Sequence, residues 1–208
     1  MRAGGANEDL VEEVVPLARG ELRVLRPRDS EGLLDEEAFE SEEFLPYWAE
    51  LWPSGAALAR DISNRSLRGA RTLELGCGLG LPSMAAALAG GRVLATDWSP
   101  DAIAMLRRNA ERSGARLDTL VCDWWQPEPL ADGAPWNLVL AADVLYERRN
   151  GDALIGLLPT LIDERGEILL ADPGRAAAEA FVERADQIFD RRTTTDGRVQ
   201  IHRLRLRA

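Results

Sequence analysis

The sequence predicts a doubly wound α/β fold with a mostly parallel sheet, a C-terminal antiparallel hairpin and an N-terminal arm. From residue 71 onward, short apolar runs alternate with segments of helical periodicity, which is typical of strands joined by crossover helices. A glycine-rich turn at residues 76–80 follows the first apolar run. Near the C-terminus, Asp196 and Gly197 form a dipeptide that strongly indicates a tight hairpin.

The N-terminal arm precedes this alternation. Its expected elements are, in order, a flexible start (1–10), a strand (22–26), an acidic helix or turn-rich segment (30–43) and an aromatic-rich segment (46–53). Pro27 is expected to end the strand. After the aromatic segment, Ser54 is expected to cap a helix that runs to about Ser63.

The alternating region supplies the sheet and its covering helices. Strands are expected at residues 71–75, 93–96, 117–121, 136–142 and 167–171. Helices are expected at residues 80–89, 100–112, 152–161 and 175–190, and the final hairpin pairs residues 191–195 with 198–207. Ser99 is a suitable cap for the second of these helices, since Pro100 follows at its first position.

Length and composition predict a single globular domain. A chain of 208 residues with 46% hydrophobic and 29% charged residues can bury a full core without disulfides. No apolar stretch approaches the ~18 residues of a membrane helix and no signal sequence is recognisable, so we expect a cytoplasmic monomer with no membrane partner. We expect residues 1–53 to form an arm packed on the core, whose residues 20–53 lid a small pocket or form a docking wall, and residues 54–208 to form the main domain.

The residue counts exclude several kinds of chemistry. Cys77 and Cys122 are the only cysteines and His202 is the only histidine, so no metal-ligand spacing occurs and we expect no metal. The same counts exclude Ser-His-Asp and Cys-His catalysis in their familiar forms. A net charge of −10 disfavours nucleic acid as a partner and favours a neutral or cationic one.

The expected strands end at positions suited to a ligand site. In an open α/β sheet, ligands bind at the carboxyl ends of the strands, near the point where the strand order reverses. These ends are Gly76, Asp97, Asp123, Asp143 and Asp172. Together they predict an acidic rim around one crevice, although each aspartate alone is equally compatible with a simple helix cap.

The glycine turn indicates how the crevice binds its ligand. Gly76 allows a tight turn, and Gly78 and Gly80 allow a ligand to approach the backbone closely. Asp97 stands 21 positions after Gly76, where a carboxylate can accept hydrogen bonds from ribose hydroxyls.

Two residues distinguish this turn from one that binds a nicotinamide dinucleotide. The dinucleotide pattern requires a third glycine where this chain has Leu81. Glu74 precedes the turn, and its carboxylate would repel a pyrophosphate but suit a ligand that carries an ammonium and a sulfonium.

These residues resemble a known family. Residues 72–80 resemble the first motif of Rossmann-like, seven-strand, S-adenosylmethionine-dependent methyltransferases, and Asp97 resembles their ribose-binding acidic residue. More specifically, residues 44–175 are similar to the protein-lysine methyltransferase group that includes the enzyme acting on the electron-transfer flavoprotein β subunit and some nicotinamide N-methyltransferase-like proteins. The similarity rests on the aromatic segment 46–53, on the Asp-Val-Leu-Tyr run at 143–146 and on the Asp-Pro-Gly-Arg run at 172–175.

The resemblance implies a cofactor site for S-adenosylmethionine. The residues that would wrap the methionine end are Gly76, Cys77, Gly78 and Gly80. Glu74 would support this end and Trp52 would cover it, although core packing also explains a tryptophan there. Asp97 would hold the ribose. Around the adenine, Asp123 would bond the amino group while Trp98 and Trp124 flank the ring.

The resemblance also implies the catalytic pair. Asp143 would orient the methyl-accepting amine, and Tyr146 would hydrogen-bond to it and wall the channel; helix capping and packing are the structural alternatives. The expected acceptor is a protein lysine, or alternatively a small-molecule amine. A nicotinamide-dependent oxidoreductase and a non-catalytic binding domain are further alternatives, which Leu81, Glu74 and the retained Asp143 and Tyr146 disfavour.

Overall fold

The computed structural model describes residues 9–29 and 47–207. Their central feature is a seven-stranded sheet in the order β5-β4-β3-β6-β7-β9-β8. The strands are β3 (Arg71–Leu75), β4 (Arg92–Asp97), β5 (Asp118–Val121), β6 (Leu138–Ala142), β7 (Glu167–Asp172), β8 (Phe189–Asp196) and β9 (Val199–Leu206). Only β9 runs antiparallel to its neighbours β7 and β8, so the predicted fold class is confirmed.

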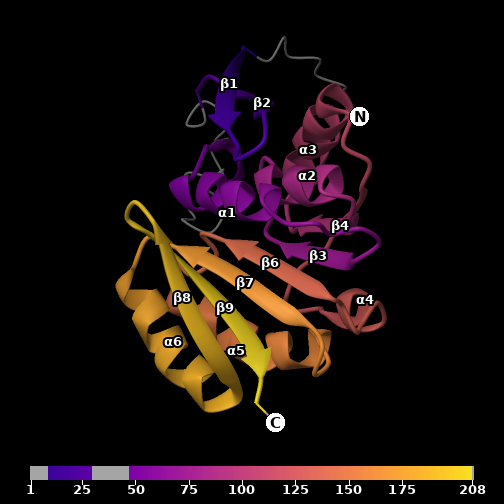
Figure 1. Cartoon of the computed structure of the whole chain (residues 1–208). Helices are drawn as coiled ribbons and strands as arrows, with labels where there is room; N and C mark the ends of the chain where they lie inside the picture. The colour runs from indigo at the N-terminus through magenta and orange to yellow at the C-terminus, as the bar shows by residue number, and fades with distance from the viewer. Residues whose placement is uncertain (1–8, 30–46, 208) are drawn as a thin grey trace.

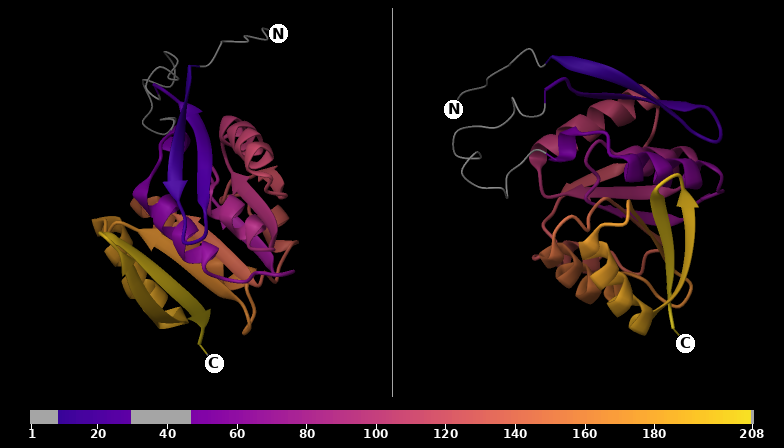
Figure 2. Two further views of the ribbon diagram at one scale, coloured as in Figure 1. Left: turned by 45° about the horizontal axis from the view of Figure 1, so that its top comes forward. Right: turned by 90° about the vertical axis from the view of Figure 1, so that its left-hand side faces the viewer.

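Helices cover both faces of this sheet (Figure 1). They are α1 (Pro53–Ser63), α2 (Leu81–Leu88), α3 (Pro100–Ser113), α4 (Glu128–Ala131), α5 (Arg148–Leu161) and α6 (Ala176–Ile188). The first three lie on one face and α5 and α6 on the other, as the two further views in Figure 2 also show. None of the helices in the described ranges is long and apolar enough to cross a membrane.

The central strands are apolar on both faces because each face packs against helices. In β6, Leu138 and Leu140 belong to the core beneath α1 and α2, whereas Val139 and Ala141 belong to the core beneath α5 and α6. Successive side chains of a strand point to opposite faces, so a doubly covered strand reads as a continuous apolar run. This is why the sequence predicted these strands well.

The N-terminal arm contains a two-stranded hairpin that the sequence predicted only in part. β1 (Leu10–Pro16) pairs antiparallel with β2 (Glu21–Pro27), which was the predicted strand. Asn109 of α3 joins the hairpin to the core: its side-chain oxygen accepts from the Leu25 N–H at 2.8 Å and its amide nitrogen donates to the Leu25 carbonyl at 3.0 Å. A fully buried side chain thus pairs with β2 as a neighbouring strand would.

Three local predictions were wrong at element ends. Ser54 does not cap α1: the cap position is Trp52, Pro53 opens the helix, and the buried Ser54 hydroxyl has no partner. α5 begins at Arg148 rather than at residue 152. α6 ends at Ile188 rather than at residue 190, because β8 already begins at Phe189. The predicted acidic segment at residues 30–43 lies outside the described residues.

Candidate active site

One cavity opens at the carboxyl ends of β3, β4 and β6, where the strand order reverses. Its walls come from the glycine turn after β3, from the start of α1 and from a turn of 3₁₀ helix, η4 (Tyr47–Ala49). A second cavity adjoins it beside the end of β5, and the two share Trp98, Trp124 and Tyr146.

The structure brings most of the predicted site residues to these cavities. Those that line the first cavity are Trp52, Glu74, Gly76, Cys77, Gly78, Asp97, Trp98, Trp124, Asp143 and Tyr146. Asp123 lines the second. Gly80 lines neither of them.

The glycine turn is pressed closely against its surroundings. Gly76 has φ 65°, and a Cβ there would lie 3.1 Å from both the Trp124 and Val144 side chains. Gly78 has φ 48°, and a Cβ there would lie 3.2 Å from the Trp48 carbonyl oxygen. Each position has a left-handed backbone and a neighbouring group close to where a Cβ would lie. Glycine is therefore required at each for two reasons.

Gly80 has a packing role rather than the ligand-facing role that the sequence suggested. It has φ 82°, and a Cβ at this position would lie 1.9 Å from Leu106 Cδ1. The glycine therefore lets α3 lie directly against the turn. The sequence pattern alone could not separate this function from close approach of a ligand.

Asp97 ties the glycine turn to the start of α3. Its Oδ2 accepts from the Gly78 N–H at 2.9 Å, and its Oδ1 accepts from the Ser99 N–H at 3.0 Å. Burial raises the pKa of this carboxyl, whereas the backbone N–H groups lower it. Because each carboxylate oxygen has two acceptor sites, Asp97 can still accept hydrogen bonds from a diol in the cavity.

Glu74 is a buried carboxyl at the floor of the first cavity. It is only 1% exposed, and the Ser83 hydroxyl donates a hydrogen bond to it. Burial raises its pKa to about 8, and the nearby Asp97 adds to this shift. A cationic group in the cavity would favour the ionised form and be held by it.

The second cavity has aromatic walls. Trp98 is 46% exposed, and the rings of Trp124 and Trp125 stack with centroids 6.4 Å apart. Asp123 is exposed at this cavity, where its Oδ1 accepts from the Trp125 N–H at 3.0 Å. Flat aromatic surfaces beside a hydrogen-bonding carboxylate suit a heteroaromatic base with an amino group.

Asp143 is the most constrained of the predicted catalytic residues. It is buried, and its backbone adopts φ 61°, a left-handed conformation that residues other than glycine rarely use. Its Oδ1 is ion-paired with the Arg175 guanidinium, while its Oδ2 is buried without a hydrogen-bond partner. An unpartnered buried carboxylate oxygen in a cavity wall requires a physical explanation, and a ligand N–H would provide one.

Tyr146 and Tyr47 stand together at the mouth of the cavity. Their ring centroids are 5.3 Å apart, and each residue is about two-fifths exposed, at 41% and 40%. The Tyr47 carbonyl also accepts from the Trp52 indole N–H at 2.7 Å, which fixes η4 against the start of α1. Burial raises the pKa of the Tyr146 phenol, so its hydroxyl remains protonated in the neutral range.

Sequence reasoning underestimated two residues, Tyr47 and Arg175. Tyr47 belongs to the aromatic segment that was singled out, yet it received no role of its own. Arg175 entered the sequence analysis only as the last residue of the Asp-Pro-Gly-Arg run. Asp172, by contrast, is a structural aspartate: its Oδ1 accepts from the N–H groups of Gly174 and Arg175 at 2.7 and 2.9 Å.

Other titratable groups do not extend the site. His202 lies on β9 and is hydrogen-bonded to Thr193, and burial lowers its pKa. Burial raises the pKa of the Cys77 thiol well above its usual value, which disfavours the nucleophilic thiolate. Within residues 9–29 and 47–207, no group of three or more His, Cys, Asp or Glu side chains is arranged to hold a metal ion.

The two cavities fit S-adenosylmethionine in their chemistry. Gly78 lines the first cavity, and Glu74 offers a buried carboxyl for a cationic amino-acid end. Asp97 offers an acceptor for a diol, and the aromatic second cavity suits a base. The three carboxyl groups, Glu74 of β3, Asp97 of β4 and Asp123 after β5, lie in the order that the amino-acid, ribose and adenine parts of this ligand require.

Comparison with known proteins identifies the family of the chain. Residues 45–188 match the lysine methyltransferase family. The chain is 38% identical over 138 residues to the electron transfer flavoprotein beta subunit lysine methyltransferase of Xenopus laevis, covering 63% of this chain and 54% of that protein. It is 32% identical to EEF1A lysine methyltransferase 3 of Mus musculus, covering 65% of this chain and 61% of that protein. The chain therefore spans little more than half the length of these relatives.

Solved structures share the fold. The T. thermophilus 16S rRNA N2 G1207 methyltransferase, in complex with AdoMet and guanosine, has a TM-score of 0.71 at 14% identity, over 95% of this chain and 51% of that chain. The ribosomal protein L11 methylase of Lactobacillus delbrueckii subsp. bulgaricus has a TM-score of 0.60 at 19% identity, over 74% of this chain and 79% of that chain. These similarities show the methyltransferase fold, and the family match covers more than half of the sequence. The chain belongs to the lysine methyltransferase family.

Proposed function

We propose that this protein transfers the methyl group of S-adenosylmethionine to the side-chain amine of a lysine in another protein. The observation that carries the proposal is the unpartnered Oδ2 of buried Asp143, in the wall of a cavity whose mouth is framed by Tyr47 and Tyr146. A carboxylate oxygen with aromatic neighbours is suited to an amine on a flexible alkyl chain.

When bound, S-adenosylmethionine supplies a methyl group that is already activated by a sulfonium sulfur. We assign Glu74 to its ammonium end, Asp97 to the ribose hydroxyls and Asp123 to the adenine amino group. Trp98 and Trp124 would enclose the adenine. The protein's own contribution is then mainly alignment, because an in-line displacement needs the nucleophile, carbon and sulfur in a row.

The acceptor amine must lose a proton before it can attack. A lysine ammonium has a reference pKa of ~10.4, so burial of its alkyl chain against the Tyr47 and Tyr146 rings would help to lower that value. The Asp143 Oδ2 accepts an N–H of the neutral amine and turns its lone pair toward the methyl group. The released proton leaves through the mouth, where both tyrosines remain partly exposed.

A lysine side chain as the acceptor is consistent with two observations. The relatives named above are protein-lysine methyltransferases, and the family match spans residues 45–188. A net charge of −10 also favours approach of a cationic side chain over an anionic one.

Two measurements test the proposal. Thermal unfolding should show a rise of about 5–10 °C with saturating S-adenosylhomocysteine and none with NAD, since a ligand at about 100 times its Kd adds about 2.7 kcal/mol. The protein should then transfer tritiated methyl groups from S-adenosylmethionine to a protein band in cell extract, and hydrolysis should release methyl-lysine. All 25 of its own basic residues are arginine, so methyl-lysine must come from another protein. Label found only in small molecules would overturn the protein-lysine assignment.

A further inference from the structure

We infer that Arg175 is a positioning residue for methyl transfer: it presents Asp143 Oδ2 to the lysine amine and offsets the charge of that carboxylate so that the amine can lose its proton. This inference rests on the proposed function. It goes beyond it by assigning a role to a side chain that does not line the cavity.

Contacts from three elements hold the Arg175 guanidinium in place. Its Nη1 is ion-paired with Asp143 Oδ1 after β6, and it lies 3.3 Å from Asp172 Oδ2 at the end of β7. Its guanidinium carbon lies 5.9 Å from the centre of the Trp52 ring, at the start of α1. Because the Asp172 carboxylate is fully buried and also bound by backbone N–H groups, it is a rigid anchor.

This anchoring selects one oxygen of Asp143. The arginine engages Oδ1, and Oδ2 is left buried without a partner, in a residue that lines the cavity. The backbone of Asp143 is fixed as well, since its N–H donates to the Ala171 carbonyl at 2.9 Å and its φ is 61°. Of the two Asp143 oxygens, Oδ2 is therefore the one available to accept from an amine, and the fixed backbone gives that contact a defined direction.

The charge of Arg175 is needed because the cavity lining is acidic. Its titratable side chains are Tyr47, Glu50, Glu74, Cys77, Asp97, Asp143 and Tyr146, with no arginine among the described lining residues. An uncompensated carboxylate in such a cavity would hold a lysine as its ammonium and oppose loss of the proton. The Arg175 guanidinium, in contact with Asp143 Oδ1, reduces that effect.

The test compares Arg175→Met and Arg175→Lys with wild type, using a lysine peptide that the wild type methylates. In Arg175→Met, kcat near neutral pH should fall about tenfold or more, and the rise of kcat with pH should move to higher pH. KM for the peptide should not increase, because Arg175→Met binds the ammonium form of the peptide lysine at least as tightly as wild type does. Arg175→Lys keeps the charge and should restore the wild-type pH profile, even if its kcat is lower.

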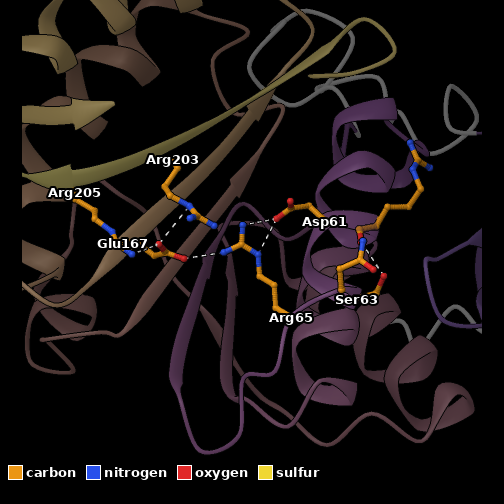
Figure 3. A network of polar contacts seen from close by, with 8 residues as sticks. Asp61, Ser63, Arg65, Glu167, Arg203 and Arg205 are labelled. Carbon is orange, nitrogen blue, oxygen red and sulfur yellow. Dashed lines mark hydrogen bonds and ion pairs between the residues drawn. The ribbon is translucent and has the colours of Figure 1, made fainter. Parts of the chain in front are cut away.

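Arg65 provides a matched control within the same chain. Arg65 also bridges two carboxylates, at 2.6 Å from Asp61 and 2.8 Å from Glu167, and it belongs to the network drawn in Figure 3. Glu167 binds Arg203 and Arg205 as well, and none of these residues lines the cavity. Arg65→Met should lower the unfolding temperature without moving the pH profile.

A binding measurement separates this inference from the proposed function. Titration of n-butylammonium into the S-adenosylhomocysteine complex reports on Asp143 whether or not any peptide is methylated. Binding should be several-fold tighter in Arg175→Met than in wild type and Arg65→Met. Equal or weaker binding in Arg175→Met, or an unmoved pH profile, would overturn the role of Arg175. Tighter binding without lysine transfer by the wild type would instead count against the proposed function alone.

Discussion

Asp143 leaves β6 with a φ of 61°, in a region where a residue other than glycine costs about 1–3 kcal/mol. Asparagine tolerates this conformation as well as aspartate does, so the amide keeps the backbone while removing the charge. The substitution therefore tests the carboxylate charge without disturbing the backbone turn.

We expect Asp143→Asn to lower kcat by about 10²-fold or more, because a misaligned or missing amine contact has effects of that size. The affinity for S-adenosylhomocysteine, measured by calorimetry, should stay within about twofold of wild type, since Asp143 is assigned to the amine. Asp196→Asn is the control, because that aspartate pairs with Arg60 away from the cavity. Wild-type turnover in Asp143→Asn would contradict the assigned role.

Glu74 makes stability depend on pH in a direction opposite to that of a paired carboxylate. Its pKa is raised by burial to about 8 in the folded protein, compared with an ordinary value of 4.5. Between these values the folded state holds a proton that the unfolded state lacks. The stabilisation is complete below pH 4.5 and is lost as the pH rises through about 8.

Glu74→Gln removes this proton and should remove the associated pH dependence. At pH 8.5 the variant should be more stable than wild type by about 2 kcal/mol, which corresponds to roughly 4–8 °C in Tm. Near pH 5 the two proteins should unfold at similar temperatures. Glu164→Gln, at an exposed carboxyl before β7, should follow wild type throughout. If the difference in unfolding free energy between Glu74→Gln and wild type were the same at both pH values, the raised pKa of Glu74 would be contradicted.

At the scale of elements, the glycine turn and α3 interlock through Gly80 and Leu106. The turn places Gly80 so close to the helix that the Leu106 Cδ1 atom takes the space of a Cβ. The same helix carries Asn109, which holds the β1–β2 hairpin. α3 therefore joins the arm to the turn that forms the cavity.

Gly80→Ala should lower the free energy of unfolding by about 3 kcal/mol or more, from the left-handed φ and the overlap together. Gly114→Ala is a matched control, because Gly114 also has a left-handed φ of 68° but has open space around it, and we expect a loss of about 1 kcal/mol there. In a Leu106→Ala background the cost of Gly80→Ala should fall to the Gly114 level. Urea unfolding gives the free energy of unfolding of the three single variants and the double variant. Equal losses for Gly80→Ala and Gly114→Ala would contradict the contact between Gly80 and Leu106.

The elements that sequence predicted well are those with a strong local pattern. β6 reads as an uninterrupted apolar run because both its faces are covered, and α3 has a serine cap whose side chain accepts from the Ala102 N–H. β1 was missed because Val11, Val14 and Val15 do not alternate regularly with polar residues. Its stability comes from pairing with β2, which is a tertiary contact.

At the scale of the whole molecule, the site could be predicted where it follows from topology. The carboxyl ends of parallel strands meet at one edge, so Asp97 and Asp143 were expected together. The pairing of Asp143 with Arg175 depends on a long side chain folding back from the loop after β7, and no local pattern encodes that. The unpartnered state of Asp143 Oδ2 likewise follows only from the packed structure.

The net charge of −10 predicts that salt weakens association with a cationic substrate. For a lysine peptide with arginine neighbours, kcat/KM should fall several-fold between about 0.05 and 0.5 M NaCl, as the screening length shortens. A peptide with neutral neighbours is the control and should change less. Equal salt dependence for both peptides would show that the overall charge does not guide binding.

The distribution of tryptophans has a practical consequence. Those that line the two cavities are Trp48, Trp52, Trp98, Trp124 and Trp125. The sixth, Trp136, lies buried under α4, where its indole N–H donates to the Leu130 carbonyl. Five of the six tryptophans therefore lie around the ligand cavities. Emission intensity and quenching should report occupancy directly, with no dye attached, and Trp136→Phe would remove the one distant emitter.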